Sequence, residues 1–379
     1  MRLRSALLAA SLAGVLATPA LAAPNDRKLD AEIERLRTAG KIPGVAVALI
    51  EDGKVARVVA KGVRNEKGDP LTPQTVMYAA SITKATFAYY VMMLVDEGKL
   101  ELDRPIAEYL PKPLPEYKAY ADLAGDPRWR AITPRMLMTH SAGFPNFRWL
   151  NPDEKLDIKL DPGTRYAYSG EGINLMQFVI EQGLGLKVGE EMNRRLFQPL
   201  GMTRSSMVWR DDFAGDLADG QHEDGKWEAH DDRSSVKAAG SLDTTIADMG
   251  KLAAAMASGW GLSTQARAEF AKVSLPISSA HEFPPFATEE NPDNARIGLG
   301  AGIGVVAFDG PQGHAFMKGG HNDITDNILV CVETGRRCVV ILTNSGFGQR
   351  IFPRLVKAAL GETGAPWAWE YGRLPPIAP

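Results

Sequence analysis

The sequence predicts an α/β protein of two lobes, in which an antiparallel sheet flanked by terminal helices adjoins a mainly helical lobe. Strand-like segments occur near both ends of the chain, within residues 44–63 and 302–343. An amphipathic helical pattern precedes the first of them at Lys28–Ala39 and follows the last at Gln349–Leu360. The long middle of the chain is mainly helical in its pattern. Strands from the two ends can complete one sheet, against which the middle folds as a second lobe.

The first strands form a hairpin pattern. Val45–Ile50 and Val55–Ala60 are rich in valine and alanine and are joined by Glu51-Asp52-Gly53-Lys54, where Asp-Gly favours a tight turn. Near the other end we expect three strands: Gly302–Phe308, Asn327–Val332 and Cys338–Thr343. We therefore expect an α/β lobe from residues 23–80 and about 295–379, a helical lobe from about 81–294, and a cleft between them.

The N-terminus has the pattern of a secretory signal. Basic residues in Met1–Arg4 precede an apolar stretch, Ala6–Leu16, and Ala20-Leu21-Ala22 is typical of a cleavage site. We expect residues 1–22 to be removed, leaving a domain of residues 23–379 that is periplasmic or secreted; a permanent N-terminal anchor is the alternative. No later segment offers the about eighteen uninterrupted apolar residues that a membrane span requires. No membrane span is therefore expected after signal removal.

Composition narrows the class of partner. The chain has 43 basic and 46 acidic residues and a net charge of −3. It therefore lacks the positive electrostatic field that would attract the phosphate backbone of a nucleic acid. We expect a small-molecule or peptide substrate and no nucleic acid. With 45% hydrophobic residues the chain can fill a large core, so its folding does not need stabilising cross-links.

The cysteines and histidines do not form a metal-binding pattern. Cys331 and Cys338 are the only two cysteines, and they flank Glu333–Arg336 in an expected hairpin. A disulfide between them and a pair of free thiols are both compatible with this placement. The His-Glu pairs at 222 and 281 lack the second histidine of H-E-x-x-H. No metal or other cofactor is expected.

Ser81-Ile82-Thr83-Lys84 opens an apolar helix that we expect to reach Glu97, with Gly98 as its stop. Residues three apart on a helix share a face, so the Lys84 amine can reach the Ser81 hydroxyl. The free N–H groups of the helix start favour negative charge beside the serine. An acylated nucleophile needs this arrangement. In isolation, the same motif is also compatible with an N-cap serine and a solvated lysine.

A second motif centres on Tyr168 in Tyr166-Ala167-Tyr168-Ser169-Gly170, on a loop that leads into the helical segment Asn174–Glu181. A phenol held near an ammonium ionises more easily than in water. Tyr168 could therefore accept the serine proton or return it to a leaving group. A buried structural tyrosine is the alternative.

The third motif is Lys318-Gly319-Gly320-His321, between the strands that end near Phe308 and begin near Asn327. Small residues such as Gly320 let a substrate approach the edge of the sheet. Lys318 could hold an anionic group, and the N–H groups of His321 and Ser81 could form an oxyanion hole. An ordinary glycine-rich turn is the alternative. We expect the imidazoles of His140 and His321 to be structural.

The three motifs together, in the order S-x-x-K, Y-x-x and K-G-G, are far less expected by chance than any one alone. The sequence here resembles the β-lactamase-related serine hydrolases, which include class C β-lactamases, D-alanyl-D-alanine carboxypeptidases, D-aminopeptidases and family VIII esterases. The resemblance covers nearly the whole chain after the signal. Further similar stretches are Ile132–Pro145, which resembles the family's LLTHTSGLP segment, Pro199–Met202, Ala239–Leu242 with Ala247-Asp248, and Leu342–Ser345.

This resemblance implies a two-lobe serine β-lactamase-like fold, acyl-enzyme catalysis and no metal. By the same resemblance Ser81 is acylated, Lys84 and Tyr168 share the general-base and general-acid work, and Lys318 stands on the strand that lines the cleft. The protein is then expected to be a serine hydrolase similar to esterases and penicillin-binding proteins.

Two departures from the family pattern bear on the substrate. Where its β-lactamases usually carry Tyr-x-Asn, this chain has Tyr168-Ser169-Gly170, so the amide that would bind a substrate's acylamide is absent. Lys318-Gly319-Gly320 also lacks the hydroxyl of the usual Lys-Thr-Gly. We therefore expect an ester, an amide or a D-amino-acid peptide as substrate. Activity as a β-lactamase or D-alanyl-D-alanine carboxypeptidase is the alternative.

Other classes of protein fit less well. An α/β-hydrolase needs G-x-S-x-G, and its nearest candidate, Ser141, has Thr139 in place of the first glycine. The glycines of Gly298–Gly304 never complete G-x-G-x-x-G, so no nucleotide cofactor is expected. A non-catalytic module that binds cell-wall peptides or β-lactams without turnover is the alternative from a different class.

Overall fold

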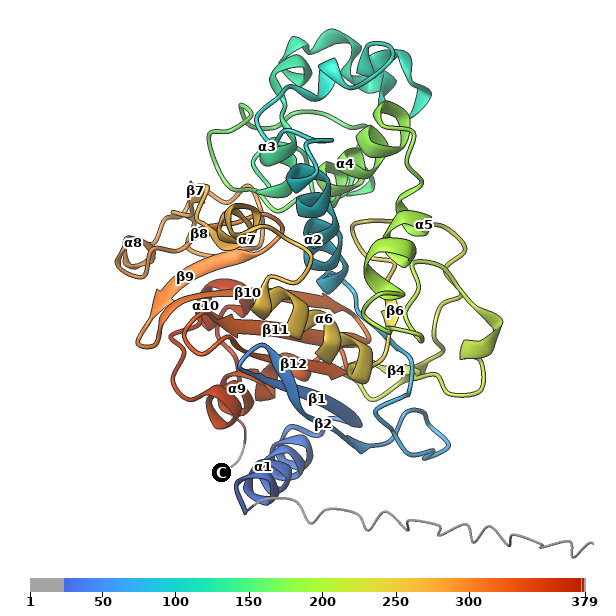
Figure 1. The fold of residues 1–379 in the computed structure, drawn as a ribbon, viewed down its shortest axis with the longest axis vertical. Coiled ribbons are helices and arrows are strands. Elements are labelled where there is room, and N and C mark those ends of the chain that lie inside the picture. Colours follow the sequence, from blue (N-terminus) through green and yellow to red (C-terminus); the bar gives the residue numbers. More distant parts are fainter. Residues whose placement is uncertain (1–23, 376, 378–379) are drawn as a thin grey trace, which may run out of the picture.

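The structure is a computed structural model that describes residues 24–375 and residue 377 (Figure 1). The expected signal, residues 1–22, lies outside these described residues, and its removal stays a prediction. None of the described helices is both long enough and apolar enough to cross a membrane.

An eight-stranded antiparallel sheet forms the centre of the α/β part, with the order β2-β1-β12-β11-β10-β9-β8-β7. The N-terminal hairpin thus joins the last strand, and Val45 lies opposite Thr343. In chain order its strands are β1 (Gly44–Glu51), β2 (Lys54–Gly62), β7 (Leu275–Pro276), β8 (Gly300–Ala301), β9 (Val306–Gly310), β10 (Gly313–Asn322), β11 (Thr325–Val332) and β12 (Arg337–Thr343).

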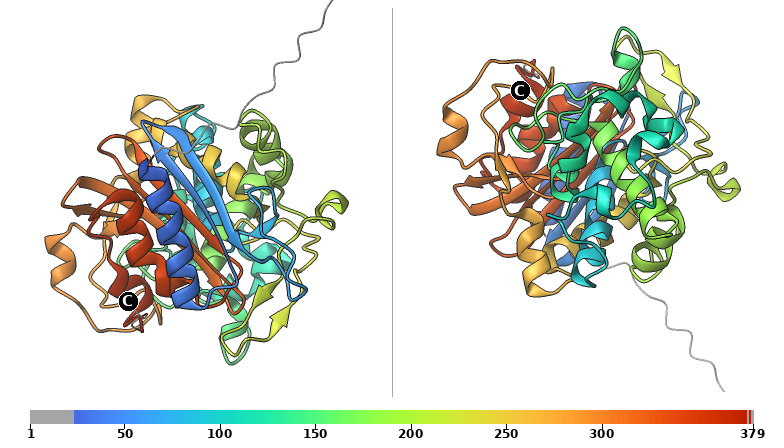
Figure 2. Two further views of the ribbon diagram at one scale, coloured as in Figure 1. Left: turned by 90° about the horizontal axis from the view of Figure 1, so that it is seen from below. Right: turned by 90° about the horizontal axis from the view of Figure 1, so that it is seen from above.

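Helices cover both faces of this sheet, as Figures 1 and 2 show. On one face α1 (Pro24–Gly40) lies beside α9 (Phe352–Leu360), and on the other α6 (Ile246–Ser258) crosses β1, β2 and β12. The pleat explains the division, since alternate residues of a strand face opposite sides. Val45 and Val47 pack in the cluster that contains α1 and α9, whereas Ala46 and Ala48 pack in the cluster that contains α6.

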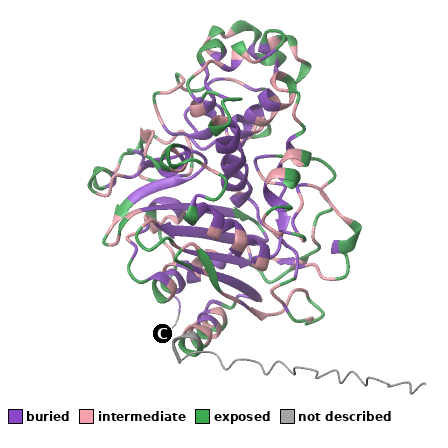
Figure 3. Ribbon diagram, viewed as in Figure 1, coloured by how far each residue is buried: buried purple, intermediate pink, exposed green. Residues whose placement is uncertain are grey.

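Helix α2 (Ile82–Asp96) links the sheet to the helical part of the molecule (Figure 1). All its residues from Ile82 to Leu94 are buried, and Figure 3 shows this burial along the helix. A helix that is apolar on every side belongs in a core. The remaining helices are α3 (Pro134–Met138), α4 (Gly170–Gly183), α5 (Val188–Met192), α7 (Thr264–Ala271), α8 (Asp293–Arg296) and α10 (Trp367–Tyr371). Two small antiparallel pairs lie outside the large sheet: β3 (Met77–Tyr78) with β6 (Asp243–Thr244), and β4 (Gly220–Gln221) with β5 (Trp227–Glu228). Short 3₁₀ and π-helical segments, among them the 3₁₀-helix Arg148–Leu150, complete the described elements.

The predicted fold class is confirmed: an antiparallel sheet with terminal helices stands beside a mainly helical part. The strand prediction for Gly302–Phe308 is wrong in its first half, because β9 begins at Val306. The expected lobe boundaries stay a prediction, although α6 and β7, both within 81–294, lie on or in the sheet.

Two features left open by the sequence are settled by the strand register. Cys331 and Cys338 lie directly opposite each other on β11 and β12 and form a disulfide. The glycine-rich segment Lys318–His321 is part of strand β10 and is not a turn. Glycine has a low strand propensity, and this strand uses it because neighbouring groups leave no room for a Cβ atom, as described below.

Candidate functional site

Ser81 and Lys84 lie at the start of α2. The Lys84 Nζ atom is 3.0 Å from Ser81 Oγ and 2.5 Å from the main-chain oxygen of Ala239. Lys84 is only 1% exposed, so its amine has almost no access to water. Ala80, immediately before the serine, has a φ of +47°, a left-handed conformation that is strained for a residue with a side chain. The serine hydroxyl is thus held next to a buried amine.

Side-chain hydrogen bonds fix the backbone on both sides of Ser81. Thr83 Oγ1 donates to the Ala80 oxygen at 2.5 Å and accepts from the Leu242 N–H at 3.2 Å. On the other side, the Asn327 amide of β11 donates to the Tyr78 oxygen at 2.9 Å. The serine is therefore anchored to the central sheet and to the segment that follows Ala239.

Tyr168 and Lys318 face the same hydroxyl. The Lys84 and Lys318 amines lie 5.0 Å and 4.8 Å from the centre of the Tyr168 ring. Ser81 and Lys318 both act to lower the pKa of the Tyr168 phenol, which indicates that its hydroxyl lies close to both side chains. The structure thus brings these four predicted side chains together, while their catalytic roles stay a prediction.

Gly320 allows β10 to pass directly over the start of α2. A Cβ atom at Gly320 would lie 2.9 Å from the Ser81 nitrogen and 2.7 Å from the Ala79 oxygen, closer than real contacts allow. Strand β9 pairs with β10 only as far as Met317, so the edge from Lys318 to Asn322 is open toward the site. The expected oxyanion pair, the N–H groups of Ser81 and His321, lies on this open edge and at the helix start.

Burial drives the pKa values of Lys84 and Tyr168 toward their neutral forms. Burial, followed by the nearby Lys318 cation, lowers the pKa of Lys84 well below 10.5. Burial raises the pKa of Tyr168 to about 12, and the opposing effect of Lys318 is smaller. The expectation that a nearby ammonium would make this phenol ionise more easily is therefore wrong. These directions favour the amine as a proton acceptor and the phenol as a proton donor.

Lys318 is the cation of the site, and two carboxyl groups that the sequence did not indicate are among the groups that raise its pKa. Burial would lower the pKa of Lys318, but Tyr168, Glu282 and Glu370 raise it above 10.5. Glu282 accepts a hydrogen bond from the Tyr166 hydroxyl at 2.6 Å and is 2% exposed. Glu282 belongs to the irregular segment that joins β7 to α8. Most of this loop is at the surface, yet Glu282 turns inward.

Glu370 lies on α10, behind β10. A Cβ atom at Gly319 would lie 2.0 Å from Glu370 Oε1, so the carboxyl group occupies the space that a larger residue at 319 would need. Burial, with the charge of Glu282, raises the pKa of Glu370 to about 8. Its Oε1 atom has no hydrogen-bond partner among the described residues. No sequence signal marked this residue, because it lies in a short helix after the last predicted element.

His140 supports the tyrosine loop. Its Nδ1 atom accepts a hydrogen bond from the Ser169 N–H at 3.1 Å, and its ring lies 4.5 Å from the Tyr168 ring. Burial, followed by the Lys318 cation and the nearby Lys84, lowers the pKa of His140 well below 6.5, which keeps the imidazole neutral. Burial likewise lowers the pKa of His321. Neither imidazole is placed as the proton acceptor of Ser81.

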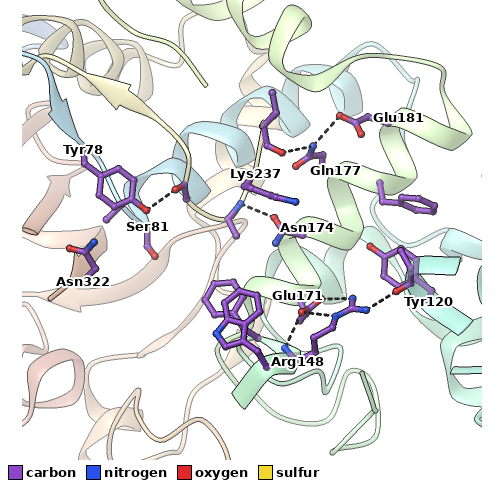
Figure 4. A pocket seen from close by; sticks show the side chains of 18 of the residues that line it. Tyr78, Ser81, Tyr120, Arg148, Glu171, Asn174, Gln177, Glu181, Lys237 and Asn322 are labelled. Carbon is purple, nitrogen blue, oxygen red and sulfur yellow. Dashed lines mark hydrogen bonds and ion pairs between the residues drawn. The ribbon is translucent and has the colours of Figure 1, made fainter. Parts of the chain in front are cut away.

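A cavity of about 640 Å³ opens at Ser81 and extends into the helical part (Figure 4). Among the described residues, no three His, Cys, Asp or Glu side chains are grouped so as to hold a metal ion. The cavity is lined by Tyr78, Ala80, Ser81, Ala119, Tyr120, Phe147, Arg148, Trp149, Glu171, Asn174, Gln177, Phe178, Glu181, Val236, Lys237, Ala239, Gly240, His321 and Asn322.

Known proteins share this arrangement of sequence and fold. The family profile described as "Beta-lactamase" matches residues 29–360. The chain is 28% identical over 185 residues to penicillin-binding protein 4 of Amycolatopsis lactamdurans, covering 45% of this chain and 46% of that protein. It is 29% identical over 224 residues to lovastatin esterase of Penicillium rubens, covering 50% and 56%. The chain thus spans about half the length of these relatives.

Among solved structures, the D-alanine carboxypeptidase AmpC of Burkholderia cenocepacia superposes with a TM-score of 0.70. The sequence identity is 19%, and the match covers 89% of this chain and 98% of that chain. This likeness shows the fold.

We predict that Glu370→Gln makes the stability less sensitive to pH. The raised pKa means that the folded protein keeps a proton which the unfolded chain releases, so the free energy of unfolding falls as pH rises from 4.5 toward about 8. Glutamine lacks this contribution. The free energy of unfolding, measured by urea titration across this pH range, should therefore fall less steeply with pH in Glu370→Gln than in the wild type. The exposed Glu289→Gln is the control, and equal slopes in all three proteins would contradict the prediction.

Proposed function

This chain belongs to the β-lactamase family, and from that premise we propose that it is an exported serine hydrolase that forms an acyl-enzyme on Ser81. Its substrate is an ester, an amide or a D-amino-acid peptide. The observation that carries the proposal is the 3.0 Å contact between Ser81 Oγ and the buried Lys84 amine. The signal-like residues 1–22 support a periplasmic or secreted location.

In the proposed acylation step the neutral Lys84 amine takes the Ser81 proton as Oγ attacks the substrate carbonyl carbon. The carbonyl electrons move onto oxygen, which the N–H groups of Ser81 and His321 stabilise. Collapse of this intermediate breaks the bond to the leaving group. The Tyr168 phenol protonates the leaving group and regains a proton from Lys84, which returns the site to its starting protonation.

Deacylation in this proposal repeats the sequence with water. Lys84 takes a proton from the attacking water. Ser81 Oγ leaves as the alcohol when Tyr168 donates its proton to it, and Tyr168 regains a proton from Lys84. The Lys318 cation lies close to the Tyr168 ring and stabilises the negative charge that develops near this phenol. Each cycle consumes one water and leaves the four side chains unchanged.

The proposed substrate class rests on two motif positions, Gly319 and Gly170, at which this chain differs from the family pattern. The Glu370 carboxyl group occupies the space above Gly319, so the hydroxyl side chain of the usual Lys-Thr-Gly has no room here. Gly170 provides no amide where the family's β-lactamases usually carry asparagine. Both differences support a substrate without the acylamide and carboxylate pattern of penicillins.

We predict that Ser81→Ala lowers turnover of p-nitrophenyl butyrate by about three powers of ten or more, because it removes the nucleophile. The wild type should hydrolyse this ester faster than nitrocefin. Intact mass measured during turnover should show an adduct on the wild type only. Activity that persists in Ser81→Ala would contradict the proposal, and a stable adduct without turnover would favour the non-catalytic binding module.

We also predict that Tyr168→Phe lowers kcat by about two to four powers of ten, because it removes a proton donor from the transition state. Tyr90→Phe is a matched control, since Tyr90 is a buried tyrosine on α2 whose hydroxyl has no hydrogen-bond partner among the described residues. It should leave kcat nearly unchanged. If Tyr168→Phe also keeps its activity, the proton transfers fall to Lys84 alone.

A further inference from the structure

An aromatic pair forms part of the wall of the cavity that opens at Ser81. The rings of Phe147 and Trp149 stack with centres 4.2 Å apart and an interplanar angle of 7°. Both residues line the cavity, and Trp149 is 60% exposed. A large flat side chain left this exposed beside a nucleophile provides a surface on which an apolar group can stack.

The aromatic pair stands where the family pattern has an amide. A Cβ atom at Gly170 would lie 2.5 Å from Phe147 Cε1, so the ring occupies the space of a side chain at this position. Gly170 is the third residue of the motif that is Tyr-x-Asn in the family's β-lactamases, where the asparagine binds the acylamide of the substrate. The acyl side of a substrate in this protein therefore meets an aromatic surface.

Most polar side chains of the cavity are already engaged. The Arg148 guanidinium pairs with Glu171 at 2.8 Å and donates to the Ala119 oxygen at 2.7 Å. The Asn174 amide oxygen accepts from the Ala239 N–H at 3.2 Å, which Figure 4 shows across the cavity. These groups shape the wall and are not free to bind a substrate's charge.

Lys237 is different, because its ammonium group makes no ion pair or hydrogen bond with any described residue. Its main chain is fixed, since its N–H donates to Ser241 Oγ at 3.0 Å and its carbonyl accepts from the Gly240 N–H at 2.9 Å. The side chain is exposed and projects over the cavity between Ser81 and Gln177 (Figure 4). A fixed backbone with an unpaired cation provides a site for an anionic group of the substrate.

We propose that this cavity selects an acyl group that combines a flat aromatic ring with a carboxylate. The ring stacks on Trp149, and the carboxylate pairs with Lys237. The inference rests on the proposed function, because it assigns the acyl part of the same Ser81 substrate. It narrows the substrate class to esters or amides of aryl-containing dicarboxylic acids.

Four p-nitrophenyl esters distinguish the effect of an aromatic ring in the acyl group from that of a carboxylate. All four share one leaving group, so only the acyl part differs. Their acyl parts are butyrate, phenylacetate, glutarate with one free carboxylate, and 1,4-phenylenediacetate with one free carboxylate. We expect the wild type to have the highest kcat/KM for the last of these and the lowest for butyrate, with most of the difference in KM.

Two variants with matched controls test whether Trp149 and Lys237 cause the preference for aryl and carboxylate acyl groups. Trp149→Ala should lower kcat/KM for both aryl esters by about tenfold and leave butyrate within about twofold. Leu150→Ala is its control, because Leu150 lies on the same short helix, is 64% exposed and does not line the cavity. Lys237→Gln should lower kcat/KM for both carboxylate esters by about threefold, and added salt should reduce the wild-type preference for them. The exposed Lys226→Gln is the control.

The outcomes distinguish this inference from the proposed function. Ser81-dependent hydrolysis with equal kcat/KM for the four esters would contradict the acyl preference and leave the proposed hydrolase function intact. The same conclusion follows if Trp149→Ala and Leu150→Ala have the same effect on kcat/KM. If no ester is turned over and Ser81 gains no adduct, the proposed function fails and this inference fails with it. Thermal unfolding of each variant confirms that the protein is folded.

Discussion

The burial of one amine is the constraint on which the rest of the site depends. Lys84 sits between Ser81 Oγ and the Ala239 carbonyl, on a helix that is buried on every side. Such a group is tolerated inside a core only when it is hydrogen-bonded or loses its charge. The Ala239 segment is held in turn by Asn174 of α4, which accepts from its N–H. The sheet, α2 and α4 together create the environment that lowers the pKa of this lysine.

The pKa of the second amine of the site, Lys318, is shifted in the opposite direction to that of Lys84. Lys318 is also buried, but Tyr168, Glu282 and Glu370 lie near it and raise its pKa. The two acids come from a loop and from helix α10, both far from Lys318 in the sequence. One amine with a lowered pKa, one amine with a raised pKa and one phenol with a raised pKa are thus grouped around a single hydroxyl. This separation of pKa values among like groups is typical of sites that transfer protons.

The sequence predicted the parts of the site that depend on local spacing. Ser81 and Lys84 share one helix face, and a three-residue spacing is sufficient to place them together. The residue pattern did not predict strand β10, which only the family resemblance implied, because Gly319 and Gly320 carry no strand pattern. The reason for these glycines is tertiary, since Glu370 and the Ser81 main chain exclude a side chain at each position. Glu282, Glu370 and the Phe147–Trp149 pair could not be found from spacing, because each acts through a contact with residues far away in the chain.

The central claim is that Lys84 is a neutral amine at the pH at which the protein works. A direct measurement is an NMR titration of protein labelled with ¹⁵N at the lysine side chains, with Lys84→Met used to assign the Nζ signal. The account predicts that the Lys84 signal changes from ammonium to amine at a pH well below 10.5, while that of Lys318 stays an ammonium throughout. A Lys84 signal that titrates at the pH of the exposed lysines would contradict the account.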